Sequence, residues 1–191
     1  MKIRNNIIIA TAAIGILLTI LVQGYVIPAN NQKKLQFAIN QQNPETHDLK
    51  SIIKYKNKYM GNMSNLSNLF YNLPLGNGGV TFQLFPDRLA ADINYKESEN
   101  SINREDNYRS LRTVIYNSTA AFALIDNLQE LKMKFADSSY IITRKDLEKW
   151  YGTKAQRLLD ENVWKSAVQS RLKDDNYIKS FSDVILLLNS K

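Results

Sequence analysis

The side chains with most catalytic potential are scarce in this chain of 191 residues. His47 is the only histidine, and no cysteine is present. Histidine-based triads and metal sites rich in histidine or cysteine need several such residues, so the composition excludes them. His47 stands beside Asp48 in a polar stretch, and we expect it to be a solvated surface residue. The sequence predicts no catalytic residue, no metal site and no cofactor.

Two serines precede a lysine by three positions, Ser51 before Lys54 and Ser170 before Lys173. In penicillin-recognising enzymes this spacing lets a lysine activate a nucleophilic serine. The further motifs of that enzyme class are missing, and serine and lysine are common enough here for the spacing to arise by chance. We therefore expect neither serine to be a nucleophile.

Acidic side chains offer a second route to catalysis. Asp126, Asp137 and Asp146 stand at the ends of predicted elements, and two of them facing each other would form an acid and base pair of the glycosidase kind. Adjacent acids at 160–161 and 174–175 lack the loop spacing and glycine of a strong calcium motif. Helix caps, turns and first-turn charges account for all of them more simply.

Four residues are the candidates for ligand binding: Asn117, Arg144, Trp150 and Tyr151. Together they would suit a peptide or a fragment of wall polymer. The alternative is a packing role, because tryptophan buries a large area and is often an anchor of a core.

The elements that must position these residues begin with an apolar run. Residues 7–27 carry no charge and follow Lys2 and Arg4. A helix of that length rises about 30 Å, which matches the hydrocarbon core of a bilayer. We predict a single-pass signal anchor in the cell membrane, in contact with lipid through residues 7–27, with a cytoplasmic N-terminus and an extracytoplasmic domain.

Two alternatives to this topology are open. A cleaved signal peptide would have a shorter apolar core, of about 7 to 15 residues. The second alternative is a reversed orientation, for which Lys33 and Lys34 after the span would count.

Beyond the anchor, assigned to residues 1–28, we expect a polar stalk over 29–48 and one domain over 49–191. The chain carries a net charge of +7. Its lysines and arginines are interleaved with acids and form no basic run, so we expect no nucleic-acid partner. The lack of cysteine excludes disulfides, so the domain must hold together by ordinary burial.

Hydrophobic periodicity predicts an α+β fold, in which a small antiparallel sheet of hairpins packs against a long helix and one transmembrane helix precedes the domain. The turn residues and helix caps set the boundaries of these elements. The predicted strands are 52–59, 80–85, 89–95, 130–136 and 140–143, the predicted helices are 63–73, 108–128, 144–151 and 160–191 with a break near 174–176, and residues 96–107 are predicted to form a loop.

Several short blocks resemble a family of domains of unknown function from the cell envelope of Gram-positive bacteria. The resemblance covers residues 51–182 and implies an exported module, either membrane-anchored or lipid-modified, rather than a reaction. Some members are associated with antirepressor-type membrane metalloproteases that sense cell-wall antibiotics. The chain departs from that pattern in having no acylated cysteine and in carrying Gly61-Asn62 in place of Gly-Asp. The blocks are Tyr55-Lys56, Tyr59-Met60-Gly61-Asn62 with Ser64, Asn72-Leu73-Pro74, Tyr116-Asn117-Ser118-Thr119, and Ile142-Thr143-Arg144 with Leu147 and Trp150-Tyr151-Gly152.

The sequence therefore predicts a non-enzymatic binding, sensor or accessory module at the bacterial cell envelope, with an envelope protein or a wall polymer as its partner. One alternative is an enzyme that acts on wall polymer through paired carboxylates. Another is a structural protein whose anchor helix pairs with a second helix through Ala10, Ala13 and Gly15.

Overall fold

A computed structural model describes residues 14–96, 108–136 and 138–186. The chain divides into two compact units, Met1–Ile39 and Asn40–Lys191. The first part of the predicted span, Asp137 and all but one residue of the loop predicted over 96–107 lie outside the described residues.

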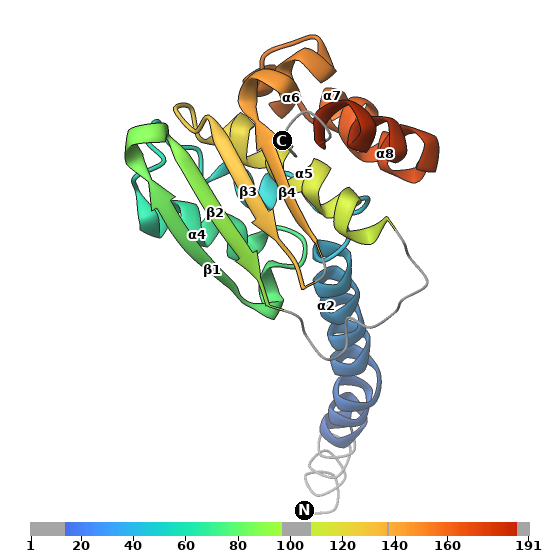
Figure 1. Cartoon of the computed structure of the whole chain (residues 1–191). Coiled ribbons are helices and arrows are strands. Elements are labelled where there is room, and N and C mark those ends of the chain that lie inside the picture. The colour runs from blue at the N-terminus through green and yellow to red at the C-terminus, as the bar shows by residue number, and fades with distance from the viewer. Residues whose placement is uncertain (1–13, 97–107, 137, 187–191) are drawn as a thin grey trace, which may run out of the picture. The chain divides into compact units, whose positions relative to one another are not determined.

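The first unit is helical throughout its described part. One continuous helix runs over Ile14–Gln41, with a π-helical turn at Val22–Val26 followed by α2 (Ile27–Gln41) (Figure 1). It is long and apolar enough to cross a membrane, and none of the residues tested in it is buried. The hydroxyl of Thr19 donates a hydrogen bond to the carbonyl of Gly15 at 2.8 Å, so this polar group is satisfied within the helix.

The second unit is built on a four-stranded sheet with the strand order β1-β2-β3-β4 (Figure 1). Both predicted hairpins are confirmed, β1 with β2 and β3 with β4, and each pairs antiparallel. The strands are β1 (Val80–Phe85), β2 (Ala90–Tyr95), β3 (Glu130–Lys134) and β4 (Ser139–Thr143).

The central pair of strands corrects the prediction of a wholly antiparallel sheet. β2 and β3 pair parallel, so the sheet is mixed. The helix α5 (Arg109–Leu124) lies between them in the sequence. A crossover through a helix returns the chain to the end of the sheet where the previous strand began, and the next strand then runs in the same direction.

Alternation along the strands separates a buried face of the sheet from a polar one. Ile93 and Met133 are fully buried neighbours on the core face. On the other face Lys134 donates to the carboxylate of Asp92 at 2.7 Å. One side of the sheet is therefore covered, as the period of two requires.

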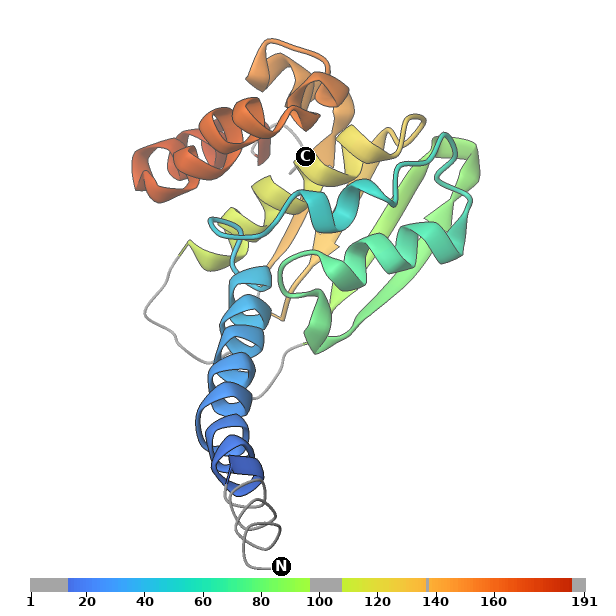
Figure 2. The ribbon, with the colours of Figure 1, turned by 180° about the vertical axis from the view of Figure 1, so that it is seen from behind.

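Two helices lie against the buried face, and Figure 2 shows the sheet from their side. The predicted cap of α4 (Met63–Asn72) is confirmed, since the side chain of Asn62 accepts a hydrogen bond from the backbone of Asn65. Every residue of α5 from Thr113 to Leu124 is buried. This confirms that the long helix packs at the centre of the core.

α5 ends at Leu124, four residues before the predicted end of the helix. Ile125 has an extended backbone and bridges to Asn57. Asn57 lies within residues 52–59, which we predicted to be a strand. That prediction is wrong: α3 (Lys50–Ile53) opens the segment and a turn follows, with the backbone N–H groups of Tyr55 and Lys56 donating to carbonyls three residues earlier.

The C-terminal helices follow their capping residues. The predicted cap of α6 (Arg144–Tyr151) by Thr143 is confirmed, and Gly152 ends the helix with a φ of +65°. The predicted break near 174–176 is also confirmed, because Asp174 caps a new helix there. The remaining elements are α7 (Glu161–Val163), α8 (Asp175–Phe181), 3-10 turns at Gly76–Gly78, Pro86–Arg88, Ala155–Leu159 and Ser170–Lys173, and π-helical turns at Trp164–Gln169 and Ser182–Leu186.

Candidate functional site

Asn117, the first of the predicted binding residues, is fully buried in α5. Its side-chain N–H groups donate to the carbonyl of Pro74 at 2.9 Å and to the hydroxyl of Tyr95 at 2.8 Å. The amide thus ties the end of the α4 segment and the end of β2 to the central helix. Burial raises the pKa of Tyr95, so its hydroxyl stays protonated at neutral pH.

Arg144 is almost completely buried at the start of α6. Its guanidinium donates to the carbonyls of Leu128 at 2.7 Å and Ile125 at 2.6 Å, beyond the C-terminal end of α5. The group also lies over the ring of Phe122, with 5.4 Å from its carbon to the ring centroid. Arg144 therefore satisfies carbonyls of the turn that follows α5.

The charge of Arg144 is balanced by Glu148, one helical turn later, at 3.5 Å. Burial alone would raise the pKa of Glu148, but the hydrogen bond from Lys154, the backbone N–H of Ala155 and the charge of Arg144 together lower it. Burial also lowers the pKa of Arg144. The pair belongs to a structural network that joins α5, α6 and the turn after them.

Trp150 and Tyr151 contact residues of different helices. The indole N–H of Trp150 donates to the hydroxyl of Tyr177 in α8 at 2.8 Å. The hydroxyl of Tyr151 lies 3.2 Å from that of Thr119 in α5. Both aromatic residues thus connect α6 to its neighbouring helices.

The structure distributes the four predicted residues over separate internal contacts rather than around one opening. Each contact given above is with another residue of the same domain. Their binding role stays a prediction, and the contacts give each of them a structural role in addition.

His47 corrects the prediction of a solvated surface residue, because only 2% of it is exposed. Its Nδ1 lies 2.8 Å from the hydroxyl of Tyr116, and its Nε2 lies 2.8 Å from the carbonyl of Asn72. The Nε2 of Gln169 donates to the carbonyls of His47 and Pro44 at 2.8 and 3.2 Å. Long-range contacts therefore hold the start of the second unit in place, and nothing in the local sequence signals them.

Of the carboxylates considered for an acid and base pair, Asp137 lies outside the described residues, and Asp146 has a structural role. Asp146 accepts from the hydroxyl of Thr143 at 2.7 Å and belongs to the cap of α6. Asp126 is exposed after the end of α5. Asp160 and Asp174 accept backbone N–H groups at the starts of α7 and α8, as predicted for helix caps.

The two serines of the Ser-x-x-Lys motifs bond to nearby backbone. Ser51 donates to the carbonyl of Asp48 at 2.7 Å, and Ser170 donates to the carbonyl of Lys165 at 2.7 Å. Within residues 14–96, 108–136 and 138–186, no cluster of three histidine, aspartate or glutamate side chains is placed to hold a metal ion.

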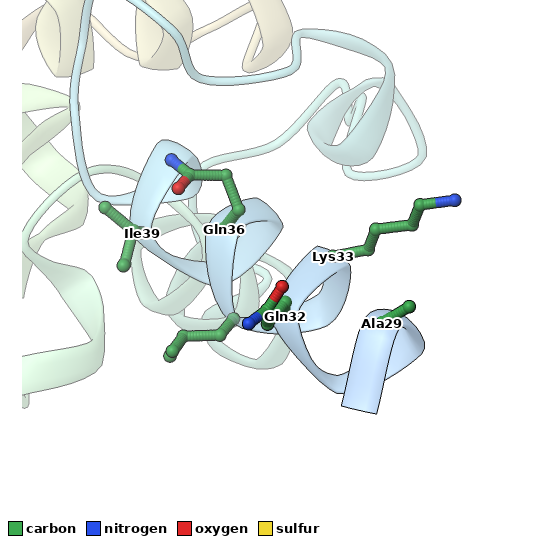
Figure 3. Close-up of a pocket in the computed structure, with 6 residues that line it drawn as sticks. Ala29, Gln32, Lys33, Gln36 and Ile39 are labelled. Atoms are coloured by element: carbon green, nitrogen blue, oxygen red, sulfur yellow. The ribbon is translucent and has the colours of Figure 1, made fainter. Parts of the chain in front are cut away.

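A shallow hollow runs along one side of α2, as Figure 3 shows. All the residues that line it belong to this one helix, and no residue of α2 is buried. A hollow of this kind does not enclose a ligand, so it defines no binding site. The lining residues are Ala29, Gln32, Lys33, Leu35, Gln36 and Ile39.

The exposed feature with a distinct chemical character is residues 54–59, Lys-Tyr-Lys-Asn-Lys-Tyr, which we name the lysine–tyrosine segment. All three of its lysines are exposed. Tyr59 is 58% exposed, and the ammonium of Lys58 lies 5.3 Å from the centroid of the Tyr59 ring. Cationic and aromatic groups thus alternate on the surface.

The sequence carries a signal for this segment, although it contains no basic run. The lysines occupy alternate positions, so no two are adjacent, yet residues 49–86 contain four lysines and no acid. The expected strand at 52–59 also concealed the feature, because alternating side chains in a strand point to opposite faces of a sheet.

Comparison with known proteins finds similarity to a family. No curated protein and no solved structure matches the chain. A family model does match, and the matched region contains α4, all four strands and α5 together with the lysine–tyrosine segment. Over residues 52–145 the chain is similar to the family described as a domain of unknown function (DUF4825).

Proposed function

We propose that this chain is a single-pass membrane protein whose domain acts outside the cytoplasm as a non-enzymatic binding or accessory module of a bacterial cell envelope. The observation that carries the proposal is the exposed apolar surface of the N-terminal helix. Ile14, Leu17 and Ile20 are each more than half exposed. Burial of apolar surface is worth about 25 cal/mol per Å², so a helix of this kind is stable when lipid covers it.

The domain itself supports binding rather than catalysis through the roles of its polar groups. Asn117, Arg144 and His47 hold distant parts of the fold together, and Asp146 caps a helix. A module with this organisation presents its surface to a partner, and its buried polar groups keep that surface in place.

The experiment that tests the proposal uses the absence of cysteine from the chain. One variant carries Ser180→Cys, at an exposed position of α8, and a second carries Asn5→Cys, before the span. Each is expressed in full length in a bacterium and treated with a membrane-impermeant maleimide. The proposal predicts that S180C is labelled in intact cells and that N5C is labelled only after lysis.

Each contrary outcome identifies a different error. Labelling of N5C but not S180C in intact cells would reverse the orientation. Recovery of S180C in the soluble fraction would show that the helix does not anchor the chain. A module role further predicts that crosslinking in intact cells captures a specific envelope protein or wall polymer with the labelled chain.

A further inference from the structure

We propose that the lysine–tyrosine segment is a binding surface for a linear polyanion that carries phosphate groups. This inference rests on the proposed extracytoplasmic location and adds to it the chemical class of the partner. The segment lies within residues 52–145, the region similar to a domain of unknown function, which assigns it no ligand.

The first support is unbalanced positive charge. Among the residues that the structure describes, Lys54, Lys56 and Lys58 form no ion pair. Other lysines of the domain are paired, as Lys134 is with Asp92 and Lys154 is with Glu148, both within 2.8 Å. Lysine is a compact charge that binds phosphate well, so three unpaired lysines together attract a polyanion.

The second support is the fixed backbone beneath these side chains. Asn57 donates its N–H to the carbonyl of Leu124 at 2.8 Å, and its own carbonyl accepts from Asp126 at 2.9 Å. The carbonyl of Lys58 accepts from Asn127 at 3.2 Å, and the side chain of Asn127 in turn accepts from the backbone N–H of Met60 at 2.7 Å. A surface held in this way is preorganised, which reduces the entropy lost when a ligand binds.

The third support is the aromatic groups between the charges. Tyr59 exposes most of its side chain, whereas Tyr55 is fixed by a hydrogen bond from Asn72 to its hydroxyl at 2.9 Å. The ammonium of Lys54 lies 5.1 Å from the centroid of the Tyr55 ring. Tyr59 can therefore contact the apolar and hydroxyl groups that link successive phosphates, while the lysines contact the phosphates.

The test uses the full chain in nanodiscs of phosphatidylcholine, and the probes are inorganic polyphosphate and poly(glycerol phosphate). Binding is measured by biolayer interferometry between about 50 and 300 mM salt, because salt screens the attraction between the lysines and the phosphates. The triple variant K54Q/K56Q/K58Q should weaken binding at least about tenfold and lower the logarithmic salt slope by about two to three. Asp126→Asn should strengthen binding, because it removes a negative charge from an exposed residue whose backbone N–H bonds to the carbonyl of Asn57 in the segment.

The matched control is K165Q/K173Q/K179Q, which removes the same charge from exposed positions in the C-terminal helices. Equal weakening by both triple variants would show that net charge alone drives binding and would overturn the proposal. Failure of the wild-type chain to bind either polymer would overturn the proposal as well. So would binding of the chain to phosphatidylglycerol vesicles but not to polymer. None of these results alters the maleimide labelling, so failure of this inference is distinguishable from failure of the proposed function.

Discussion

His47 and Tyr116 are 69 positions apart in the sequence, and a hydrogen bond of 2.8 Å joins the Nδ1 of one to the hydroxyl of the other. The opposite nitrogen, Nε2, faces the carbonyl of Asn72. A carbonyl only accepts hydrogen bonds, so this network assigns the proton to Nε2 and leaves Nδ1 to accept from Tyr116. The imidazole is held neutral between the central helix and the end of α4.

This arrangement predicts an acid-sensitive domain. Burial lowers the pKa of His47 below its ordinary value of 6.5, against weaker opposing effects of the bond to Asn72 and the charge of Asp48. The unfolded chain therefore binds a proton that the folded chain rejects. The stability that neutral His47 supports is complete above pH 6.5 and falls below it by up to about 1.4 kcal/mol per pH unit, until the folded pKa is reached.

The measurement is urea unfolding of the full chain in detergent between pH 4.5 and 7.5, followed by tryptophan fluorescence. Both tryptophans, Trp150 and Trp164, lie in the second unit, so the signal reports that domain. His47→Gln should flatten the dependence between pH 6.5 and 5. Glu148, whose pKa is lowered, acts only below its ordinary value of 4.5, outside this pH range, so it does not contribute to the measured slope. An unchanged slope in H47Q would contradict the assignment.

Arg144 should be among the most sensitive positions of the domain. Arg144→Ala removes two hydrogen bonds from a charged group to the carbonyls of Ile125 and Leu128. It also removes the ion pair between Arg144 and Glu148. We expect a loss of about 3 kcal/mol in the free energy of unfolding. The exposed neighbour Lys145 supplies the control, since Lys145→Ala should change stability by less than about 0.5 kcal/mol. Similar effects of the two substitutions would refute this structural role of Arg144.

The contact between Trp150 and Tyr177 can be measured by a double-mutant cycle. Besides the hydrogen bond, the rings lie 5.3 Å apart between centroids. Trp150→Phe and Tyr177→Phe should each be destabilising, and the double variant should show a coupling energy of about 1 kcal/mol. Additive effects would show that Trp150 makes no stabilising hydrogen bond here, and would leave it available as a ligand-binding residue.

The sequence predicted those elements whose ends carry local signals. Asn62 and Thr143 are N-caps and Gly152 is a C-terminal glycine, and each acts within a few residues of its own position. The parallel pairing of β2 with β3 has no local signal, because it depends on the path of the whole crossover. His47 was misplaced for the same reason, since its partners come from α4, α5 and the C-terminal helices.

The lysine–tyrosine segment likewise combines features that local sequence signals with features that depend on long-range contacts. Composition alone reveals that residues 49–86 are free of acids. The exposure of the lysines and the fixed backbone of Asn57 depend on contacts with Leu124 and Asp126, which only the folded chain brings near. Local sequence thus indicates the charge of the surface but not its geometry.

Two glycines provide a final prediction, because the same substitution should have opposite effects at them. A Cβ at Gly76 would overlap the carbonyl oxygen of Phe70, whereas a Cβ at Gly61 would meet nothing within 4 Å. Gly76→Ala must displace backbone and should cost about 3 kcal/mol. Gly61→Ala restricts the unfolded chain without strain and should stabilise the domain by about 0.5 kcal/mol. Urea unfolding at pH 7.5 distinguishes the two, and a tolerated alanine at Gly76 would show that the backbone between α4 and β1 does not pack as closely as the fold requires.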